Sequence, residues 1–494
     1  MRSLRVAAFA GLLGAFAVSA VAASLVDAVR GENRDAAVSL IDQRVAVNER
    51  SPDGTTALHW ATHNGDADLV GRLIKAGANV KAVNDYGVTP MSEAAERADV
   101  QLLSLLLKAG ADVESPNAEG QTALMTVART NHVDAAKLLL SHRANVNAVE
   151  QWRGQTALMW AAAQSQPEMV ELLITHHADV NARSQIRQWP RQITAEPRAQ
   201  NRPAGGFTAL LLAAREGCAP CALSLVKGGA DINLGDPDNI SPLLMATLNG
   251  RFDAAAALIK AGANPNKWDT WGRAPLYSSV DYNTVPRGGR PDRPSSDQTT
   301  ALDVVALLLK AGANPNMQLK LFPPYRSLGQ DRGGDPMLTI GATPLLRAAK
   351  AADVGSIRLL LAHGASVDLA SVQGITPFMA TAGVGSTTID TRARFRNEQQ
   401  CIEAGKLLLA AGANVNAARD SGQTALHGAA LWGWNDYVKV LADSGANLDA
   451  QDRNGMKALD VALGKVGGTG RAGVSAPEPH QDTAALLQKL AAKN

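Results

Sequence analysis

A repeat period of 33 residues constrains this chain more than any other feature of its sequence. Aligned on the Gly that precedes Thr-Ala/Pro-Leu, six of the ten intervals between segment starts are 33 residues and a seventh is 34. The other three intervals, of 52, 69 and 48 residues, are interpreted as insertions into the same frame. Such a period is typical of solenoids, which grow by stacking neighbouring units, so we predict one elongated domain. The segment starts are Gly54, Gly87, Gly120, Gly154, Gly206, Asn239, Gly272, Gly341, Gly374, Gly422 and Gly455.

The unit that starts at Gly422 shows the pattern inside one period. Thr424 opens a first helix, Gly433 breaks it, and Asp436–Ala442 forms a second helix. Gly-x-Thr-Ala/Pro-Leu-His, an Ala-Ala pair, a Leu run and Gly-Ala-Asn-Leu/Val-Asp/Asn follow in this order, and together they resemble the ankyrin repeat. The resemblance implies an all-α repeat solenoid over residues 24–494, with about twelve stacked ankyrin repeats and short β-hairpin fingers.

The recurring polar residues of the frame have structural roles. Thr at the start of the first helix, as in Thr56 and Thr424, is expected to cap free backbone N–H groups and to join the next turn. His59 and His427 are expected to belong to the same network. Leucines at matching positions are predicted to form a continuous core. They are Leu58, Leu73, Leu124, Leu138, Leu158, Leu172, Leu210, Leu345, Leu359, Leu408 and Leu426.

A Gly follows the second helix in most units, where a left-handed backbone conformation is favoured. Arg143 and His177 occupy this slot in the units that start at Gly120 and Gly154. A residue other than Gly costs about 1 kcal/mol in this conformation, so these two units are predicted to be locally weaker.

The first 23 residues have the pattern of a signal peptide. Arg2 and Arg5 form a basic region, Val6–Val18 is apolar and uncharged, and Ala20-Val-Ala22 or the triplet one residue later suits cleavage. We therefore expect residues 1–23 to direct export to the periplasm or to secretion. An uncleaved membrane anchor is the main alternative.

Charge and composition exclude several classes of function. Removal of Arg2 and Arg5 leaves 46 basic and 46 acidic residues, so a general nucleic-acid binder is not expected. No second apolar run is long enough to span a bilayer. Aromatic residues make up 4% of the chain, which suits thin Ala/Leu helix pairs better than a thick core.

Four insertions interrupt the frame, and residues 455–494 form a C-terminal capping unit. Two of them extend the fingers and two lie between the helices of a unit. Together they contain twelve Arg and one Lys against eight acidic residues, with aromatic residues among them. This composition is typical of binding sites, although the rings could instead hold each loop on the solenoid. The insertions span 184–204, 281–298, 317–340 and 383–400.

Cys218-Ala-Pro-Cys221 is the strongest chemical motif in the chain. Pro220 suits the first position of a helix, so Cys221 would lie near a helix N-terminus that lowers the pKa of a thiol. Redox motifs of this spacing normally follow a β-strand, and zinc would need two more ligands, with only Cys401 remaining. Packed thiols or a local disulfide, a redox pair and a metal-related pair are the three alternatives.

No other motif indicates catalysis, a cofactor or a metal site. Gly468-Thr-Gly470-Arg-Ala-Gly473 matches the dinucleotide fingerprint by letter, but it follows a helix and lies in a Gly-rich spacer. No nucleophile, base and orienting acid occur in a recognisable arrangement. We therefore expect no catalytic residues, no cofactor and no enzyme activity.

The ankyrin resemblance implies that partners bind on a concave face made by finger tips and the ends of the first helices. Large apolar residues at these positions suggest a contact surface, because monomers rarely leave such patches uncovered. The sequence favours a hot region of Trp and Tyr side chains with arginines from one insertion. The hot region consists of Trp268, Trp271, Tyr277, Tyr282, Arg287, Arg290 and Arg293. The other candidates for partner binding are Trp152, Leu431 and Trp432.

These observations favour an exported, monomeric scaffold or adaptor that binds another protein. A thiol-based redox or accessory protein acting through Cys218 and Cys221 is one alternative. A carbohydrate or small-ligand binder that uses the Trp- and Arg-rich loops is another, and it predicts a deep pocket between a finger and the groove.

Overall fold

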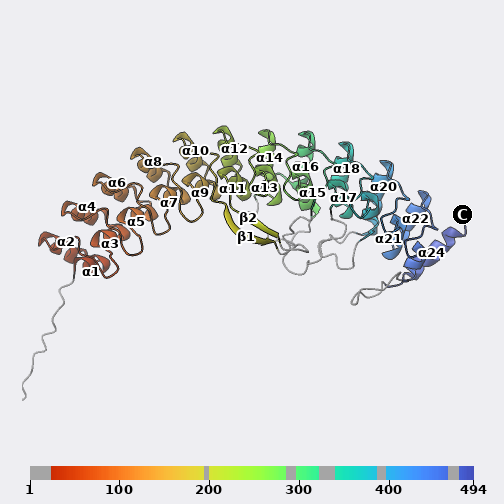
Figure 1. Ribbon diagram of the computed structural model, residues 1–494, viewed down its shortest axis with the longest axis horizontal. Helices are drawn as coiled ribbons and strands as arrows, with labels where there is room; N and C mark the ends of the chain where they lie inside the picture. Colours follow the sequence, from red (N-terminus) through yellow and green to blue (C-terminus); the bar gives the residue numbers. More distant parts are fainter. Residues whose placement is uncertain are drawn as a thin grey trace, which may run out of the picture. The chain divides into compact units, whose positions relative to one another are not determined.

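The computed structural model describes residues 24–193, 200–284, 296–321, 340–385, 397–465 and 478–493, with the backbone alone at 188–193 and 200–203. The chain divides into two compact units. The first contains the described residues up to Val127 and Asp134–Asn145, and the second contains Ala128–Val133 and Val146 onward. Each unit is a stack of helix pairs (Figure 1).

The first unit begins at Ser24, whose hydroxyl accepts a hydrogen bond from the Asp27 N–H at 3.0 Å and caps α1. Its helices are short because a left-handed residue or a turn ends each of them within about three turns. The helices that lie wholly or mostly in this unit are α1 (Leu25–Arg30), α2 (Arg34–Asp42), α3 (Ala57–Asn64), α4 (Ala67–Lys75), α5 (Pro90–Arg97), α6 (Val100–Lys108), α7 (Ala123–Arg129) and α8 (Val133–Ser141).

The second unit has the same arrangement of pairs. In Figure 1, α9, α11 and α13 form one row, α10, α12 and α14 form another, and consecutive members of a row are in contact. The helices are α9 (Ala157–Ala163), α10 (Pro167–Thr175), α11 (Ala209–Glu216), α12 (Ala219–Lys227), α13 (Pro242–Leu248), α14 (Phe252–Lys260), α15 (Pro275–Thr284), α16 (Ala301–Lys310), α17 (Pro344–Lys350), α18 (Val354–Ala362), α19 (Pro377–Thr381), α20 (Glu398–Ala410), α21 (Ala425–Leu431), α22 (Asn435–Asp443), α23 (Ala458–Ala462) and α24 (Gln481–Ala491).

The predicted Thr–His network is confirmed at both histidines. Thr424 caps α21, and its N–H and hydroxyl lie 3.1 and 3.0 Å from Nδ1 of His427. Nε2 of His427 lies 3.0 Å from the carbonyl oxygen of Met456 in the next repeat. His59 makes the same contacts with Thr56 and Val88 in the first unit. Each histidine therefore links a helix start to the following repeat.

The backbone confirms the alignment of the repeats. Asn239, which stands where other repeats start with Gly, has a φ of 62°, close to the 75° of Gly87. Arg143 and His177 have φ values of 66° and 65°, so both adopt the left-handed conformation predicted from their slot.

The leucine core matches the prediction on the first helices but is shifted on some second helices. Leu58, Leu158 and Leu426 are buried, as predicted. Leu172 is only half-buried, whereas Leu173 is fully buried. The same correction applies to Leu138 and Leu359, whose neighbours Leu139 and Leu360 form the core. Adjacent residues point about 100° apart on a helix, so a run of leucines does not show which one faces inward.

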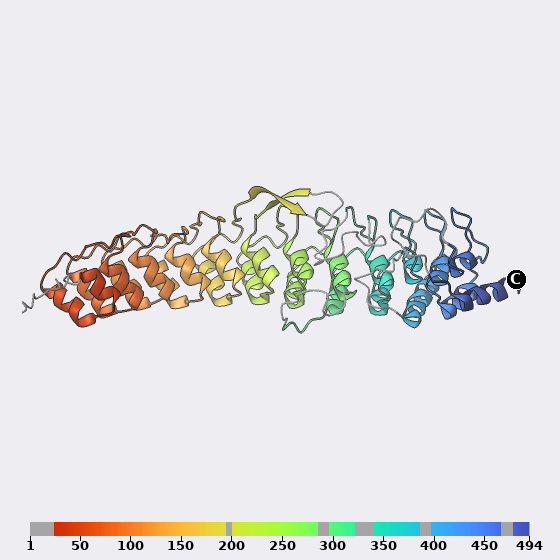
Figure 2. The same ribbon diagram turned by 90° about the horizontal axis from the view of Figure 1, so that it is seen from below.

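A finger is the loop from the end of one second helix to the start of the next first helix. The fingers are mostly turns, and single β-bridges such as Ala418↔Thr424 replace the predicted β-hairpins in three of them. In the described parts of the chain the only strands are β1 (Arg187–Ile193) and β2 (Gln200–Ala204), which pair antiparallel inside the insertion 184–204. Figure 2 shows this hairpin among the finger loops at one edge of the second unit.

The described ends of the insertion 281–298 are tied to the frame. Helix α15 continues to Thr284, past the predicted start of the insertion. Asp281 accepts a hydrogen bond at 2.5 Å from the guanidinium of Arg347 on α17. On the other side, Asp253 of α14 accepts hydrogen bonds from the N–H groups of Gln298 and Thr299 at 3.0 and 2.9 Å. Residues 285–295 lie outside the described residues.

The insertion 383–400 follows α19, a first helix of only five residues, and α20 begins before the predicted end of the insertion. Tyr437 of α22 is fully buried, and its hydroxyl lies 2.6 Å from the hydroxyl of Thr381 on α19. The Tyr437 N–H donates to Glu398 at the start of α20. A Cβ at Gly405 would lie 2.0 Å from the Tyr437 hydroxyl, so glycine makes room for the ring. Tyr437 thus joins three helices around this insertion.

The described part of the C-terminal capping unit contains two helices, α23 and α24. Helix α24 begins at Gln481 with His480 at the cap position, and Asp482 lies in its first turn. The N–H of His480 donates to the carbonyl of Ala462 at 2.7 Å, which attaches α24 to α23.

Candidate functional site

Backbone hydrogen bonds between neighbouring fingers set the position of each tip. In the second unit, the N–H of Gln185 donates to the carbonyl of Arg153 at 2.7 Å, and the N–H of Thr270 donates to Asp238 at 3.0 Å. The same bond joins Val372 to Ile340 at 2.9 Å. The tips therefore form a regular row, in which each finger presents equivalent residues.

Large apolar side chains remain exposed along this row. Trp152 is 68% exposed, Trp268 is 37% exposed, and Val372 is 60% exposed. Three further residues of the same row, Val149, Ile186 and Leu321, are also exposed. We name the exposed residues Val149, Trp152, Ile186, Trp268, Leu321 and Val372 the finger row.

A cation covers each exposed tryptophan of the finger row. The guanidinium carbon of Arg187 lies 5.3 Å from the ring centroid of Trp152, and its Nη2 donates to the Trp152 carbonyl at 2.7 Å. Nζ of Lys320 lies 3.4 Å from the ring centroid of Trp268. Arg187 and Lys320 belong to the two finger insertions, so the insertions supply the cations and the regular fingers supply the rings.

Trp271 and Tyr277 are core residues, which corrects their prediction as contact residues. Trp271 is 1% exposed and lies 5.0 Å from the guanidinium of Arg273, which pairs with the fully buried Asp269 at 2.7 Å. Tyr277 is 4% exposed and packs with Leu319 and other buried residues. A ring that is this deeply buried stabilises the fold and offers no surface to a partner.

The remaining residues of the predicted hot region lie in or beside an insertion. Tyr282 on α15 is half-buried and makes an edge contact with Phe252, with ring centroids 5.1 Å apart. Arg287, Arg290 and Arg293 lie outside the described residues. The contribution of these three arginines to a contact surface therefore stays a prediction.

Leu431 and Trp432 lie at the end of α21, as predicted, but they have different surroundings. The Trp432 indole N–H donates to the carbonyl of Gly383 at 3.4 Å, and its ring stacks on Trp434 at 5.9 Å. Leu431 lines a hollow between α21 and the last finger. The hollow has a volume of about 150 Å³, and it includes Lys465 and ten other lining residues.

The size of this hollow bears on the small-ligand alternative. Sites for drug-sized ligands have volumes of about 300–1,000 Å³. A hollow of about 150 Å³ is too small for an oligosaccharide but large enough for one side chain of a partner. The geometry near Leu431 therefore favours a protein contact.

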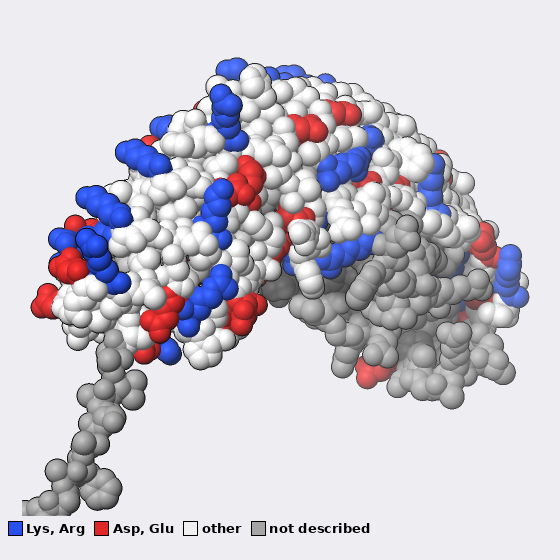
Figure 3. Space-filling view, turned by 60° about the vertical axis from the view of Figure 1, so that its left-hand side comes forward, with Lys and Arg blue, Asp and Glu red and all other residues white. Residues whose placement is uncertain are grey.

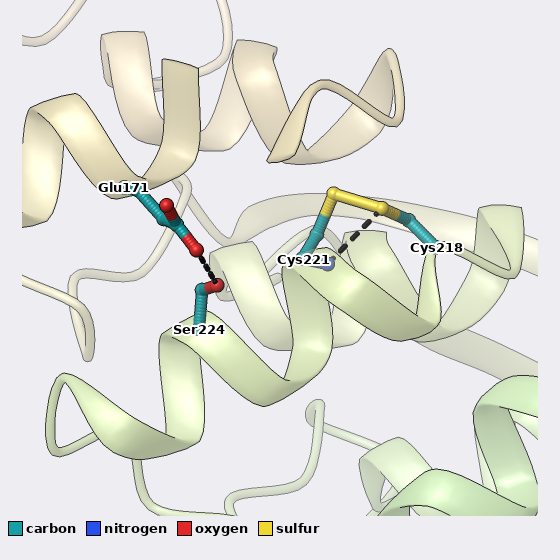
Figure 4. Close-up of a disulfide and its surroundings, with 4 residues drawn as sticks. All are labelled: Glu171, Cys218, Cys221 and Ser224. Carbon is teal, nitrogen blue, oxygen red and sulfur yellow. Dashed lines mark hydrogen bonds between the residues drawn. A yellow bond between two sulfur atoms is a disulfide. The ribbon is translucent and has the colours of Figure 1, made fainter. Parts of the chain in front are cut away.

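Cys218 and Cys221 form a disulfide at the N-terminus of α12 (Figure 4). Cys221 is fully buried and Cys218 is 8% exposed. The N–H of Cys221 donates to the sulfur of Cys218 at 3.2 Å, so the pair also caps the helix. Ser224, one turn later, donates to Glu171 on α10 at 2.8 Å. The structure therefore shows a local disulfide, which is also the oxidised form of a redox pair, and the burial of both cysteines limits their access to a redox partner.

The finger carboxylates are used within the fold. Glu150 is buried and accepts hydrogen bonds from the N–H groups of Trp152, Arg153 and Gln155. Asp236 accepts from two N–H groups in its own finger, and burial, together with the nearby negative charges of Asp238 and Asp269, raises its pKa to about 6. Glu150 and Asp236 are therefore engaged within their own fingers.

Charge on the visible face of Figure 3 is mixed, with Lys, Arg, Asp and Glu interspersed among uncharged residues. Among the described residues, no group of three or more His, Cys, Asp or Glu side chains is placed to hold a metal ion. Within the same ranges, every helix is too short or too polar to cross a lipid bilayer.

Sequence reasoning missed two features of this region. The cations Arg187 and Lys320 were not recognised as partners of specific rings, because the insertion lengths hide their position in the frame. The burial of Tyr437 was also missed. Gly405 in the middle of α20 was the available signal, since glycine inside a helix often marks the close approach of another group.

Several curated proteins share parts of this sequence. Over 142 residues the chain is 30% identical to human SH3 and multiple ankyrin repeat domains protein 2, which covers 25% of this chain and 8% of the relative. It is 36% identical over 98 residues to the Drosophila melanogaster Neurogenic locus Notch protein, and this match covers 20% of this chain and 4% of that protein. A third match is the Caenorhabditis elegans Ankyrin repeat and KH domain-containing protein mask-1, 32% identical over 108 residues, covering 22% and 4%. The chain thus spans only a small part of the length of these relatives.

Two solved structures are also similar in part. The crystal structure of the human ASB11 ankyrin repeat domain matches with a TM-score of 0.40 and 21% identity, covering 49% of this chain and 98% of that domain. The crystal structure of the ankyrin repeat domain of Bcl-3, described as a unique member of the IκB protein family, matches with a TM-score of 0.38 and 28% identity. This match covers 45% of this chain and 92% of that domain.

The family comparison covers most of the chain. A model described as Ankyrin repeats (3 copies) matches residues 25–117, 93–184, 192–269, 210–319 and 395–469, and a model described as Ankyrin repeat matches 340–371. Proteins built from these repeats are generally protein-interaction scaffolds. With its repeat frame, helix pairs and matched segments in agreement, this chain belongs to the ankyrin-repeat family.

Proposed function

We propose that this protein is an exported scaffold or adaptor that binds another protein through its fingers and the ends of its first helices. The observation that carries the proposal is the finger row, in which Trp152 remains 68% exposed and Val372 remains 60% exposed. Exposed apolar residues that recur at equivalent positions are typical of contact surfaces. The proposed role needs no catalysis, cofactor or metal.

Affinity capture from the exported fraction tests this proposal. The bait is the full chain, compared with a variant in which Trp152, Trp268 and Leu431 are replaced by Ala. A matched control carries Leu223→Ala on α12, where an exposed leucine lies outside the finger row. We expect the control to retain the captured partner and the finger variant to lose it. Capture of the same proteins at the same yield by the finger variant would contradict the proposal.

Export itself is proposed from the signal-like residues 1–23. Ser24 caps α1 directly after the expected cleavage site, so cleavage would leave the first helix and its cap intact. Mass spectrometry of the exported protein is expected to find an N-terminus at Ala23 or Ser24. An intact N-terminus on membrane-bound protein would instead support the uncleaved anchor.

We also propose a monomer of about twelve repeats, in which α24 packs against α22 and α23. The last helix places charged residues such as Lys489 in its final turn, where they face water. Sedimentation equilibrium is expected to give the mass of one chain. A concentration-independent dimer mass would contradict the monomer.

A further inference from the structure

We propose that the finger row of the second unit docks an acidic polypeptide segment. Arg187 and Lys320 would pair with carboxylates of the segment, while Trp152 and Trp268 cover its apolar side chains. This inference rests on the proposed function as a protein-binding scaffold, and it adds the chemistry of the partner.

The first argument is the charge of the exposed surface. The carboxylates directly beside the two exposed tryptophans are turned inward, because Glu150 accepts from three backbone N–H groups and Asp269 pairs with Arg273. Within the described part of the chain, neither Arg187 nor Lys320 pairs with a carboxylate. A segment that carries Asp or Glu would therefore meet two cations at fixed positions.

The second argument concerns how the cations are held. Arg187 is fixed twice, by its position 5.3 Å from the centroid of Trp152 and by its 2.7 Å hydrogen bond to the Trp152 carbonyl. Lys320 is placed by its backbone, since its N–H donates to the carbonyl of Trp271 at 2.9 Å. A cation that is already ordered loses little conformational entropy when a carboxylate binds.

The third argument separates an acidic peptide from a nucleic acid or a sugar. Bases and sugar rings bind tryptophan mainly by stacking on a face of the ring. One face of each exposed indole is already covered by a cation, at 5.3 Å on Trp152 and at 3.4 Å on Trp268. That face is therefore closed to stacking, and the cation with the ring edge beside it suits a carboxylate next to an apolar side chain.

The backbone of the hairpin argues for recognition by side chains. Strand β1 contains Pro190 and strand β2 contains Pro203, which have no N–H to donate to an added strand. A partner would therefore find little opportunity for strand addition here.

Fluorescence anisotropy with a defined probe tests this inference. The probe is a labelled peptide of repeated Glu-Glu-Leu units, compared with peptides of repeated Gln-Gln-Leu units and with a single-stranded oligonucleotide of equal length. We expect the full chain to bind the Glu peptide at least about ten-fold more tightly than the other two, with an affinity that falls as salt rises.

Replacement of Arg187 and Lys320 by Gln is expected to weaken binding of the Glu peptide about ten-fold. The control variant carries Lys227→Gln and Arg358→Gln, which remove the same charge from exposed positions on α12 and α18 and should leave the affinity unchanged. Equal affinities for the Glu and Gln peptides, tighter binding of the oligonucleotide, or an unchanged affinity of the variant with Arg187→Gln and Lys320→Gln would each overturn the inference. If the captured partner still depended on Trp152 and Trp268 in that case, the scaffold function would stand without the acidic ligand.

Discussion

The base and the tip of the fingers in the second unit both contain a tryptophan beside an arginine, but the ring at the base is buried and the ring at the tip is exposed. At the base, Trp271 is 1% exposed and its neighbour Arg273 is paired with Asp269. At the tip, Trp152 is 68% exposed, and Arg187 covers its ring without a carboxylate partner among the described residues. A tryptophan beside an arginine is therefore structural or available for binding according to its position in the repeat frame.

The largest effect is expected at the finger base. Trp271→Ala removes a fully buried ring and should lower the free energy of unfolding by about 3–5 kcal/mol. Urea denaturation monitored by circular dichroism measures this change. A loss below about 1 kcal/mol would break the distinction between base and tip, because it would mean that the ring is not part of the core.

Tyr437 is a second fully buried aromatic residue, and Gly405→Ala tests how tightly its ring is packed. The added Cβ would lie 2.0 Å from the Tyr437 hydroxyl, which Thr381 holds at 2.6 Å, so we expect a loss of about 1–3 kcal/mol. Gly71→Ala on α4 is the matched control, since nothing lies within 4 Å of its Cβ. The control should be neutral or stabilising. Equal stabilities of the two variants in urea would argue against the tight packing around Tyr437.

Asp236 is a partly buried finger residue, and its raised pKa predicts that the stability of the protein depends on pH. Its pKa is raised to about 6, mainly by burial, so the protonated form favours the folded state. This contribution is present below about pH 4 and is lost as the pH rises to about 6. Asp236→Asn keeps the acceptor oxygen for the N–H groups of Asp238 and Ile240. We expect it to stabilise the protein by about 1–2 kcal/mol at pH 7 and by much less at pH 4.

Denaturation of wild type and variant at several pH values measures this difference. A constant difference between pH 4 and pH 7 would show that Asp236 does not titrate in this range.

A smaller effect on stability is expected at His177, an exposed residue in the slot that glycine occupies in most repeats. Its φ of 65° makes His177→Gly favourable by about 1 kcal/mol, since glycine adopts this conformation without a steric cost. Hydrogen exchange of the α10 amides should become slower in the variant. Faster or unchanged exchange would show that the left-handed residue does not limit the local stability of this repeat.

The smallest change in stability is expected at the finger tip. Trp152→Ala should alter the free energy of unfolding by less than about 0.5 kcal/mol, because most of the ring is in contact with water. The same denaturation experiment as for Trp271 gives the direct comparison. A loss that approached that of Trp271→Ala would mean that the tip is structural, and the finger row would lose its assignment as a contact surface.

The repeat frame could be predicted from the sequence because its recurring residues have local roles, such as capping a helix or adopting a left-handed backbone conformation. The start at Asn239 was found by spacing, and its φ of 62° confirms it. The roles of His59 and His427 followed from their distance to a capping Thr. Exposure could not be predicted in the same way. Trp268 and Trp271 are three residues apart, and only the path of the chain through the finger shows that one is exposed and the other buried.

The helix-end positions were also only partly predictable. Leu431 was placed correctly at the end of α21, but the contact of Trp432 with Gly383 depends on a turn that begins an insertion. Contacts of this kind join residues that are distant in the sequence, and no local pattern indicates them. The arginines 287, 290 and 293 stay a prediction, because they lie outside the described residues.

Asparagine side chains between consecutive fingers have a consequence for how this protein can change over evolution. Asn266 donates to the carbonyl of Gly312 at 2.9 Å and accepts from the N–H of Asn314 at 2.6 Å, across an insertion. Asn416 makes the same two contacts with Gly445 and Asn447, at 3.0 and 2.7 Å, where no insertion intervenes. Doubling the length of a flexible loop costs only about 0.6 kcal/mol. Loops can therefore be gained, lost or exchanged between such clamped repeats, and new binding specificities can arise while the frame that carries them is inherited unchanged.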